Sequence, residues 1–247
     1  MPPDVILTEA ERESALTTPS DALIRQMKGM AGTLMIVGAG GKMGPTLAVL
    51  AARAVAASGS KLKIIAVSRF SDPSQKEWLQ ARNISTISAD LLDDGDVKEL
   101  PDADFVVSLA GKKFGTSVDP SETWAVNCLA SASVCKGFRG SSIVALSTGN
   151  VYPVVALDSG GSNEDDTLIA TGEYSAAAIG RKCHQICGDA ERRGRRHFRD
   201  RSTRRSKSAD YRIGHGTGLA AGTARSQPFH RRWHGEHPRA TFTSLWR

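Results

Sequence analysis

The amino-acid sequence predicts an α/β fold with a doubly wound parallel sheet, and three observations support this prediction. Short β-rich runs alternate with helix-length stretches through about the first 190 of 247 residues. The runs are continuously apolar rather than alternating, which is typical of strands buried on both faces of a parallel sheet. A glycine-rich segment directly follows the first run, as expected at a tight strand-to-helix turn.

Five runs are expected to form strands, each bounded by Gly, Pro, Ser or Asp: residues 34–37, 64–67, 84–87, 105–109 and 143–146. Four helices are expected between them: one opening at Pro45, one capped by Asp72 or Ser74, a short one near residues 94–100, and a long one from about Ser121 to Gly137.

Three further segments lie outside this alternation. Residues 7–30 are expected to form two helices, the second capped within residues 17–20. Residues 159–166 are rich in Gly, Ser and acid and predict a surface loop, and residues 173–191 have the Ala-rich pattern of a helix.

Composition changes sharply near residue 190. Residues 191–247 contain 15 Lys and Arg against 4 Asp and Glu, so they carry +11, while residues 1–190 carry −5. Ile, Leu and Val supply only 3 of those last 57 residues, which predicts a disordered or irregular basic tail. We therefore expect a helical extension at residues 1–30, a Rossmann-like body at 31–192 and a low-order basic tail at 193–247.

Cysteine usage and hydropathy indicate a cytoplasmic protein. The four cysteines form no CxxC pair, so a reduced compartment is the economical interpretation. No basic segment followed by an apolar one begins the chain, and no apolar run approaches 18 residues, so neither a signal peptide nor a membrane span is expected. His230, His234 and His237 lie in the aperiodic tail, and we expect no metal there.

The segment from Gly38 to Gly44 predicts a dinucleotide-binding turn. Glycines permit a tight turn, close approach of the backbone to a pyrophosphate, and contact between helix and strand, while the following helix N-terminus attracts phosphate. The glycine spacing fits two patterns, and both remain open. They are GxGxxxG, which uses Gly40, and GxxGxxG, which uses Gly38, Gly41 and Gly44. The cofactor-binding candidates here are Gly38, Gly41, Lys42, Met43 and Gly44. The alternative is a tight turn without a ligand.

The end of the second expected strand bears on cofactor choice. A NAD site usually places an acidic residue there for the ribose 2′-hydroxyl, whereas this sequence has Ser68 and Arg69. A hydroxyl followed by a guanidinium suits a 2′-phosphate better, so NADP is favoured and NAD remains an alternative. Arg69 could also be an exposed arginine at a strand end.

Further segments resemble the NAD-dependent epimerase/dehydratase family of the extended short-chain dehydrogenase/reductase superfamily, over about residues 31–190. The resemblance implies roles for Asp90 and Leu91 at adenine, for Ala110, Gly111 and Lys112 beneath the nicotinamide ribose, and for Asn127 in steadying the active site. Residues 147–152 resemble the family's Ser-Ser/Thr-x-x-Val-Tyr segment, which implies Thr148 as the catalytic hydroxyl. Membership implies a Rossmann body, a nicotinamide cofactor and a C-terminal substrate domain. The composition after residue 190 suggests a truncated or frameshifted member.

The family's catalytic Tyr-x-x-x-Lys pair is incomplete. Tyr174 is followed four residues later by Ala178, and Arg181 and Lys182 come seven and eight residues after it. An ordinary phenol has a pKa near 10, so without an adjacent cation Tyr174 is expected to be a poor base. Arg181 could instead reach a phosphate or ribose. The alternative for Tyr174 is a partly buried helix tyrosine without a catalytic role.

Two functions are therefore expected from the sequence. The first is an NAD(P)-binding relative of these oxidoreductases that acts on a small molecule, with a nucleotide sugar as the candidate, and that is weakly active or inactive in this form. The second is a non-catalytic Rossmann module whose basic tail contacts nucleic acid. Sparse aromatic residues in the tail disfavour the second.

Overall fold

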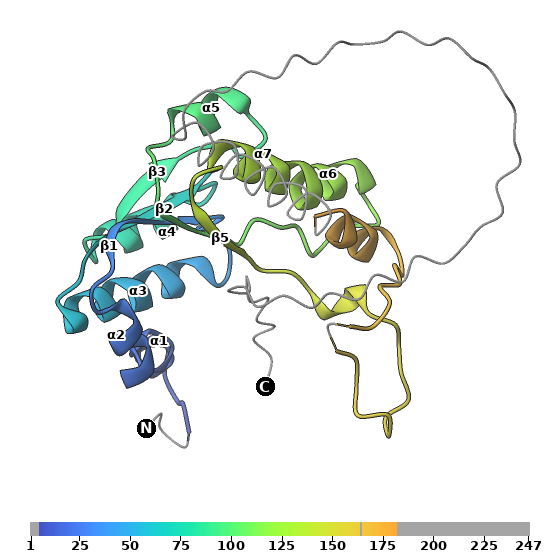
Figure 1. Ribbon diagram of the computed structural model, residues 1–247, viewed down its shortest axis with the longest axis horizontal. Coiled ribbons are helices and arrows are strands. Elements are labelled where there is room, and N and C mark those ends of the chain that lie inside the picture. The colour runs from blue at the N-terminus through green and yellow to red at the C-terminus, as the bar shows by residue number, and fades with distance from the viewer. Residues whose placement is uncertain (1–4, 164, 182–247) are drawn as a thin grey trace, which may run out of the picture.

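A single parallel sheet organises the computed structural model, which describes residues 5–163 and 165–181 (Figure 1). Its strands lie in the order β3-β2-β1-β4-β5. Their bounds are β1 Ala31–Val37, β2 Lys61–Ser68, β3 Ser85–Ser88, β4 Phe105–Ser108 and β5 Ser142–Ala145. The five strands are those expected from the sequence, with ends shifted by one to three residues, and the predicted fold class is confirmed.

Helices cover both faces of the sheet because alternate residues of β1 point to opposite sides. Leu34 and Ile36 pack in one apolar cluster with α3 (Gly44–Ser58) and α4 (Pro73–Gln80). Met35 and Val37 pack in a second cluster with α5 (Asp94–Glu99) and α7 (Ala130–Gly137). These two clusters form the core of a three-layer structure. Asp72 caps α4, which is one of the two caps expected.

Two N-terminal helices, α1 (Glu9–Thr17) and α2 (Asp21–Met27), pack against α3 and continue the first cluster. Ser20 caps α2, as expected. The Arg53 guanidinium donates a hydrogen bond to the buried Thr17 hydroxyl, and Arg82 donates two to Glu13. Residues 9–27 are thus an integral layer of the body (Figure 1).

The single long helix expected from Ser121 to Gly137 is interrupted. It consists of α6 (Pro120–Trp124), a π-helical turn η1 (Ala125–Leu129) and α7. One extra residue per turn at η1 shifts the side chains that follow, and such π-turns occur frequently at functional sites. Apolar periodicity alone could not reveal this interruption.

The two edge strands, β3 and β5, depart from the expected burial, since neither contains a fully buried residue. In β5 the Val144 side chain is 52% exposed, because β5 is an edge strand of the described sheet and α3 lies across β1 and β2. Burial on both faces holds for residues 34–37 of the central strand β1 but not at the edges of the sheet.

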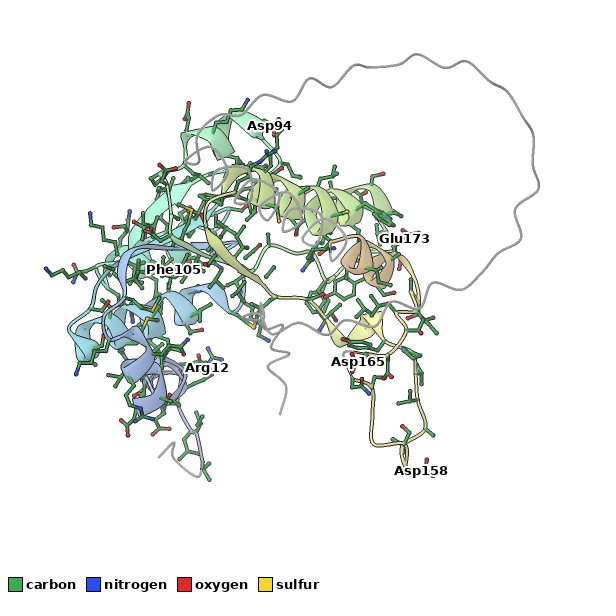
Figure 2. The ribbon with its side chains drawn as sticks, viewed as in Figure 1. Arg12, Asp94, Phe105, Asp158, Asp165 and Glu173 are labelled. Carbon is green, nitrogen blue, oxygen red and sulfur yellow. The ribbon has the colours of Figure 1, made fainter. Side chains whose placement is uncertain are left out.

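The remaining expectations concern the chain after β5. Residues 159–163 are exposed, as a surface loop requires, and Asp158 lies at the tip of this projecting loop (Figure 2). Residues 173–181 are helical, and the rest of the expected helix, Cys183, Cys187, the tail and its histidines lie outside the described residues. No helix within residues 5–163 and 165–181 has the length and apolarity needed to cross a membrane.

Candidate functional site

The glycine turn between β1 and α3 is packed so closely that side chains are excluded. Gly38 has a φ of +79°, and a Cβ there would lie 2.7 Å from the Ala110 nitrogen. A Cβ on Gly44 would overlap the backbone of Ala39. Gly38 and Ala39 donate backbone hydrogen bonds to the Val67 carbonyl, which fixes the turn between β2 and β4. The backbone therefore passes close to the carboxyl ends of all three central strands.

The first turn of α3 has no side-chain cap. Its N-cap residue, Met43, makes no capping hydrogen bond, and Pro45 follows in the first turn. Helix N-termini leave backbone N–H groups without intrahelical partners, and these groups attract anions together with the helix dipole. This end of α3 can accept a phosphate.

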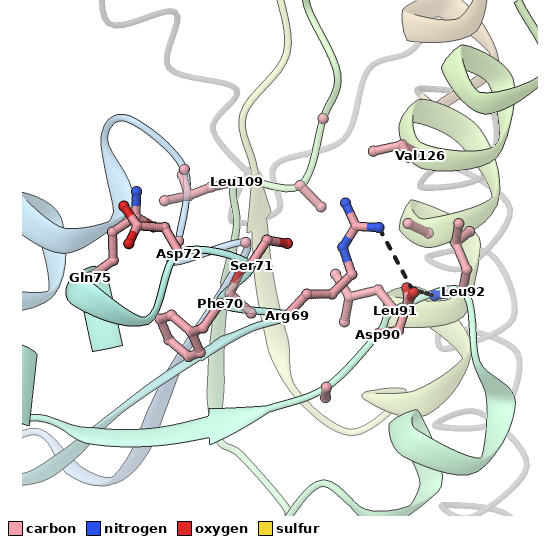
Figure 3. A pocket seen from close by; sticks show the side chains of 18 residues that line it. Arg69, Phe70, Ser71, Asp72, Gln75, Asp90, Leu91, Leu92, Leu109 and Val126 are labelled. Atoms are coloured by element: carbon pink, nitrogen blue, oxygen red, sulfur yellow. Dashed lines mark hydrogen bonds and ion pairs between the residues drawn. The ribbon is translucent and has the colours of Figure 1, made fainter. Parts of the chain in front are cut away.

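The end of β2 brings Ser68 and Arg69 beside this turn. The Ser68 hydroxyl lies so near Gly40 that a Cβ on Gly40 would be 2.8 Å from its oxygen. The Arg69 side chain is 56% exposed, and its Nη1 lies 4.0 Å from Asp90 Oδ2 (Figure 3). Phe70 has a φ of 49° and joins the first apolar cluster, and it also lines the cavity. The guanidinium is therefore held loosely, with room for a second anionic partner.

A cavity of about 330 Å³ lies along the carboxyl ends of β1, β2 and β4 (Figure 3). Ligands bind in this position in open α/β sheets, where the strand order reverses. Eight of the predicted cofactor-binding residues line it: Gly38, Gly41, Ser68, Arg69, Asp90, Leu91, Ala110 and Gly111. Most of the cofactor-binding residues predicted from the sequence therefore lie around one cavity.

Five predicted residues lie outside the lining. Lys42 and Met43 are exposed, Gly44 is buried at the start of α3, and Lys112 and Asn127 lie behind Gly111. The amide of Asn127 pairs with the Lys112 backbone: its Nδ2 donates to the Lys112 carbonyl at 2.9 Å, and its Oδ1 accepts from the Lys112 nitrogen at 3.1 Å. These two hydrogen bonds fix the segment after β4 against η1.

No hydrogen bond joins the two predicted catalytic residues within the described part of the chain. Thr148 follows β5, and its hydroxyl oxygen accepts a hydrogen bond from the Asn150 nitrogen at the start of η2 (Gly149–Val151). Tyr174 is half-buried in the helix at residues 173–181, next to Glu173, whose carboxylate accepts from the Trp124 indole. Neither residue lines the cavity.

The Arg181 side chain is bonded inside the protein. The sequence left open that Arg181 could reach a phosphate or ribose, but the guanidinium is buried and donates to the carbonyls of Asn127 and Leu146. Burial lowers its pKa from the usual arginine value, while electrostatic interaction with Tyr174 and Cys128 raises it. A cation therefore lies within electrostatic range of Tyr174, although the sequence reasoning left this tyrosine without one.

The cavity also has lining residues that the sequence analysis missed as site residues, among them Ser71, Asp72, Gln75, Leu92 and Val126. Asp72 stood out only as a helix cap, and Gln75 follows it in the first turn of α4 (Figure 3). Asp72 and Gln75 reach the cavity because α4 begins directly after the end of β2, which no short motif signals.

The residues present fit the adenosine and diphosphate parts of a dinucleotide. At Gly38 and Gly44 the backbone carries no side chain beside a helix N-terminus, so a diphosphate can approach it closely. Serine, arginine and aspartate side chains line the adjoining part of the cavity. Cavities of about 300–1,000 Å³ are the usual size for small-molecule sites.

Comparison with known proteins agrees with this architecture. Among solved structures, the enzyme WbmG of Bordetella bronchiseptica in complex with NAD has 19% identity and a TM-score of 0.54, over 64% of this chain and 50% of that one. DesIV, a dTDP-glucose 4,6-dehydratase from Streptomyces venezuelae with NAD bound, has 18% identity and a TM-score of 0.54, over 62% and 50%. UDP-glucose 4-epimerase from Thermotoga maritima has 16% identity and a TM-score of 0.53, over 64% and 52%.

These likenesses establish the fold, and the chain spans about half the length of the structures it matches. None of the curated proteins matches it significantly. The model of the NAD dependent epimerase/dehydratase family matches residues 34–183, which cover the sheet, the glycine turn and the helix that carries Tyr174. The chain therefore belongs to the NAD-dependent epimerase/dehydratase family.

Proposed function

We propose that this protein binds a nicotinamide dinucleotide in the cavity and that it prefers NADP(H) to NAD(H). The observation that carries the proposal is the backbone cradle at Gly38, where a Cβ would lie 2.7 Å from Ala110, beside a cavity lined by Ser68 and Arg69. The diphosphate would lie at this turn, and the adenosine ribose would lie at the end of β2.

The preference for NADP(H) rests on charge. Among the described residues, Arg69 is the one basic side chain that lines the cavity, and it can offer two parallel donors to a 2′-phosphate. Asp90 neutralises part of this charge, but at 4.0 Å and with both side chains well exposed the pair is weak. A phosphate would compete successfully with such a partner.

The substrate we propose is a small molecule, with a nucleotide sugar as the candidate class. This follows from family membership and from the proteins of similar fold, whose names include a UDP-glucose epimerase and a dTDP-glucose dehydratase. The cofactor supplies hydride transfer when it is bound. This chain's own groups for orienting a substrate hydroxyl or carbonyl are Thr148 and Tyr174.

We expect turnover to be weak or absent. Ala178 replaces the lysine of the family's tyrosine-lysine pair, and it is 1% exposed in the helix at residues 173–181. The helix therefore presents no ammonium group one turn after Tyr174, where it would hold a ribose and a phenolate. Cofactor binding is thus the part of the function best supported in this chain.

The test is a titration of the full chain with NADPH, followed by intrinsic fluorescence or calorimetry, before and after Gly38→Ala. The added methyl group would meet backbone atoms that cannot rotate away, so we expect the dissociation constant to rise about tenfold or more, as for one lost hydrogen bond to a charged group.

Gly29→Ala is the matched control. Gly29 also has a positive φ, +84°, but no atom lies within 4 Å of its Cβ position. This variant shares the backbone strain without the close contact, so NADPH binding should remain within about twofold. Equal losses in the two variants, or no NADPH binding by the unchanged chain, would refute the proposed site.

A further inference from the structure

Within the described residues, the buried guanidinium of Arg181 donates hydrogen bonds to uncharged oxygens only. Its side chain is among the buried charged groups, at 6% exposure, and it makes three hydrogen bonds. Nε donates to the Asn127 carbonyl at 2.8 Å, Nη1 to the Leu146 carbonyl at 2.7 Å, and Nη2 to the Asn127 side-chain oxygen. Among the described residues no carboxylate forms an ion pair with it.

This arrangement lowers the stability of the fold. Burying a cation without an anionic partner is unfavourable, and a structural arginine is usually paired. Two of its five N–H groups also have no acceptor within the described part of the chain. The sequence could have satisfied the same three oxygens with smaller neutral donors.

The three acceptors belong to segments that the sheet topology brings to one edge. Leu146 begins the loop after β5, and Asn127 lies in the π-helical turn η1. Asn127 in turn pairs with both backbone groups of Lys112, in the loop after β4. Arg181 therefore links the helix at residues 173–181 to η1 and to the loops that follow β4 and β5.

This network lies directly behind one wall of the cavity. Gly111 lines the cavity, and a Cβ on Gly111 would lie 3.1 Å from Arg181 Nη2 and 3.0 Å from Asn127 Oδ1. The rest of the cavity is lined by the glycine turn after β1, by Arg69 after β2 and by Asp90 after β3. Figure 3 shows Arg69 and Asp90. Arg181 thus supports only the end of the cavity that is farthest from β3.

We propose that Arg181 is a positioning residue for the nicotinamide half of the cofactor: its three-way guanidinium contact sets the loops after β4 and β5 at the distance that admits this half. The inference rests on the proposed dinucleotide site. It assigns to Arg181 a structural task that the i+4 lysine position cannot perform, because Ala178 has no donor. A planar fork with donors in three directions is required, and a lysine ammonium cannot reach all three oxygens with the same geometry.

The test separates whole cofactors from their adenosine halves. Dissociation constants are measured for NADPH and NADH, and for adenosine 2′,5′-bisphosphate and AMP, with the unchanged chain, Arg181→Lys and Arg181→Met. We expect both variants to bind the whole cofactors at least tenfold more weakly, while the adenosine halves change less than twofold. Thermal unfolding in the absence of ligand records any general loss of structure.

Two further variants keep the test decisive. In Gly111→Ala the added methyl group would crowd Asn127 and Arg181 without removing the buried charge. It should selectively weaken binding of the whole cofactors, even if the Arg181 variants fail to fold. Arg82→Met removes a half-buried arginine that pairs with Glu13 far along the chain, and it should leave both classes of ligand unaffected.

Three results would overturn the inference. They are unchanged binding of whole cofactors by Arg181→Lys and Gly111→Ala, equal weakening of whole cofactors and adenosine halves, and an Arg82→Met effect as large as that at Arg181. Failure of the unchanged chain to bind any whole cofactor would instead refute the proposed function on which the inference depends.

Discussion

Arg69 controls the charge of the cavity where the adenosine ribose would lie. Its guanidinium extends over the end of β2 toward Asp90, and its exposed side chain has freedom to meet a ligand (Figure 3). Ser68 adds a hydroxyl beside Gly40. The balance between Arg69 and Asp90 therefore determines whether a 2′-phosphate or a 2′-hydroxyl is the better partner.

Arg69→Asp should erase or invert the preference for NADP(H). An aspartate repels the 2′-phosphate and can accept a hydrogen bond from a ribose hydroxyl, as in NAD sites. We expect NADPH affinity to fall at least tenfold while NADH affinity holds or improves, measured by competitive titration. Arg12→Asp, an equal charge change on α1, is the control and should alter neither affinity. A parallel loss for both cofactors would show that Arg69 acts through structure alone.

Turnover, where it can be measured, should depend on Thr148 more than on Tyr174. A hydroxyl after β5 can orient a substrate carbonyl without ionising, whereas a tyrosine base needs a stabilising cation. Arg181 is within electrostatic range of Tyr174, but its guanidinium is committed to carbonyl oxygens. The comparison is kcat/KM for Thr148→Ala and Tyr174→Phe.

The expected ordering is a larger loss for Thr148→Ala. A loss of about 100-fold or more for Tyr174→Phe beside a mild Thr148 effect would reverse it, and would mean that Arg181 takes the place of the missing lysine. Thermal unfolding of both variants serves as the control, because the Thr148 hydroxyl also caps η2.

Local signals decided how far individual site residues could be predicted. Glycine spacing after a strand located the turn at Gly38, because close backbone approach leaves a visible pattern in the sequence. The role of Arg181 left no such pattern, since its partners Asn127 and Leu146 are 54 and 35 residues away and contribute mainly carbonyl oxygens. Backbone acceptors are present at every residue and cannot be recognised from residue type.

At the scale of elements, the N-terminal helices were predicted as helices but their packing was not. Caps at Thr8 and Ser20 mark where α1 and α2 begin. Nothing in that segment indicated that Met27 would join the core beside β1 and α3. The π-helical turn η1 was missed for a related reason: it depends on the fit of neighbouring elements rather than on its own residues.

Met27→Ala should therefore lower the free energy of unfolding of the whole body by about 2–5 kcal/mol, as usual for truncation of a buried methionine. Urea denaturation followed by circular dichroism measures this change. Leu16→Ala is the matched control, because Leu16 lies on α1 with 52% of its surface exposed and should cost about 0.5 kcal/mol or less. Equal small effects would mean that the N-terminal helices contribute little to the body.

At the scale of the whole molecule, the order of strands places the cavity. Alternation of strands and helices predicted the parallel sheet, and the order β3-β2-β1-β4-β5 puts the reversal of strand order between β1 and β4. Residues from the loops after β1, β2, β3 and β4 therefore meet at one edge, although 73 positions separate Gly38 from Gly111. The exposed face of β5 could not be foreseen, because its apolar run is indistinguishable from that of a buried strand.

The most direct test of the account is the ratio of dissociation constants for NADPH and NADH, measured by calorimetry on the unchanged full chain. Charge-assisted hydrogen bonds from Arg69 to a 2′-phosphate are worth about 1.5–3 kcal/mol, so NADPH should bind at least about tenfold more tightly. Equal affinities would contradict the assignment of Arg69 and Ser68, and the absence of binding by either cofactor would contradict the site itself.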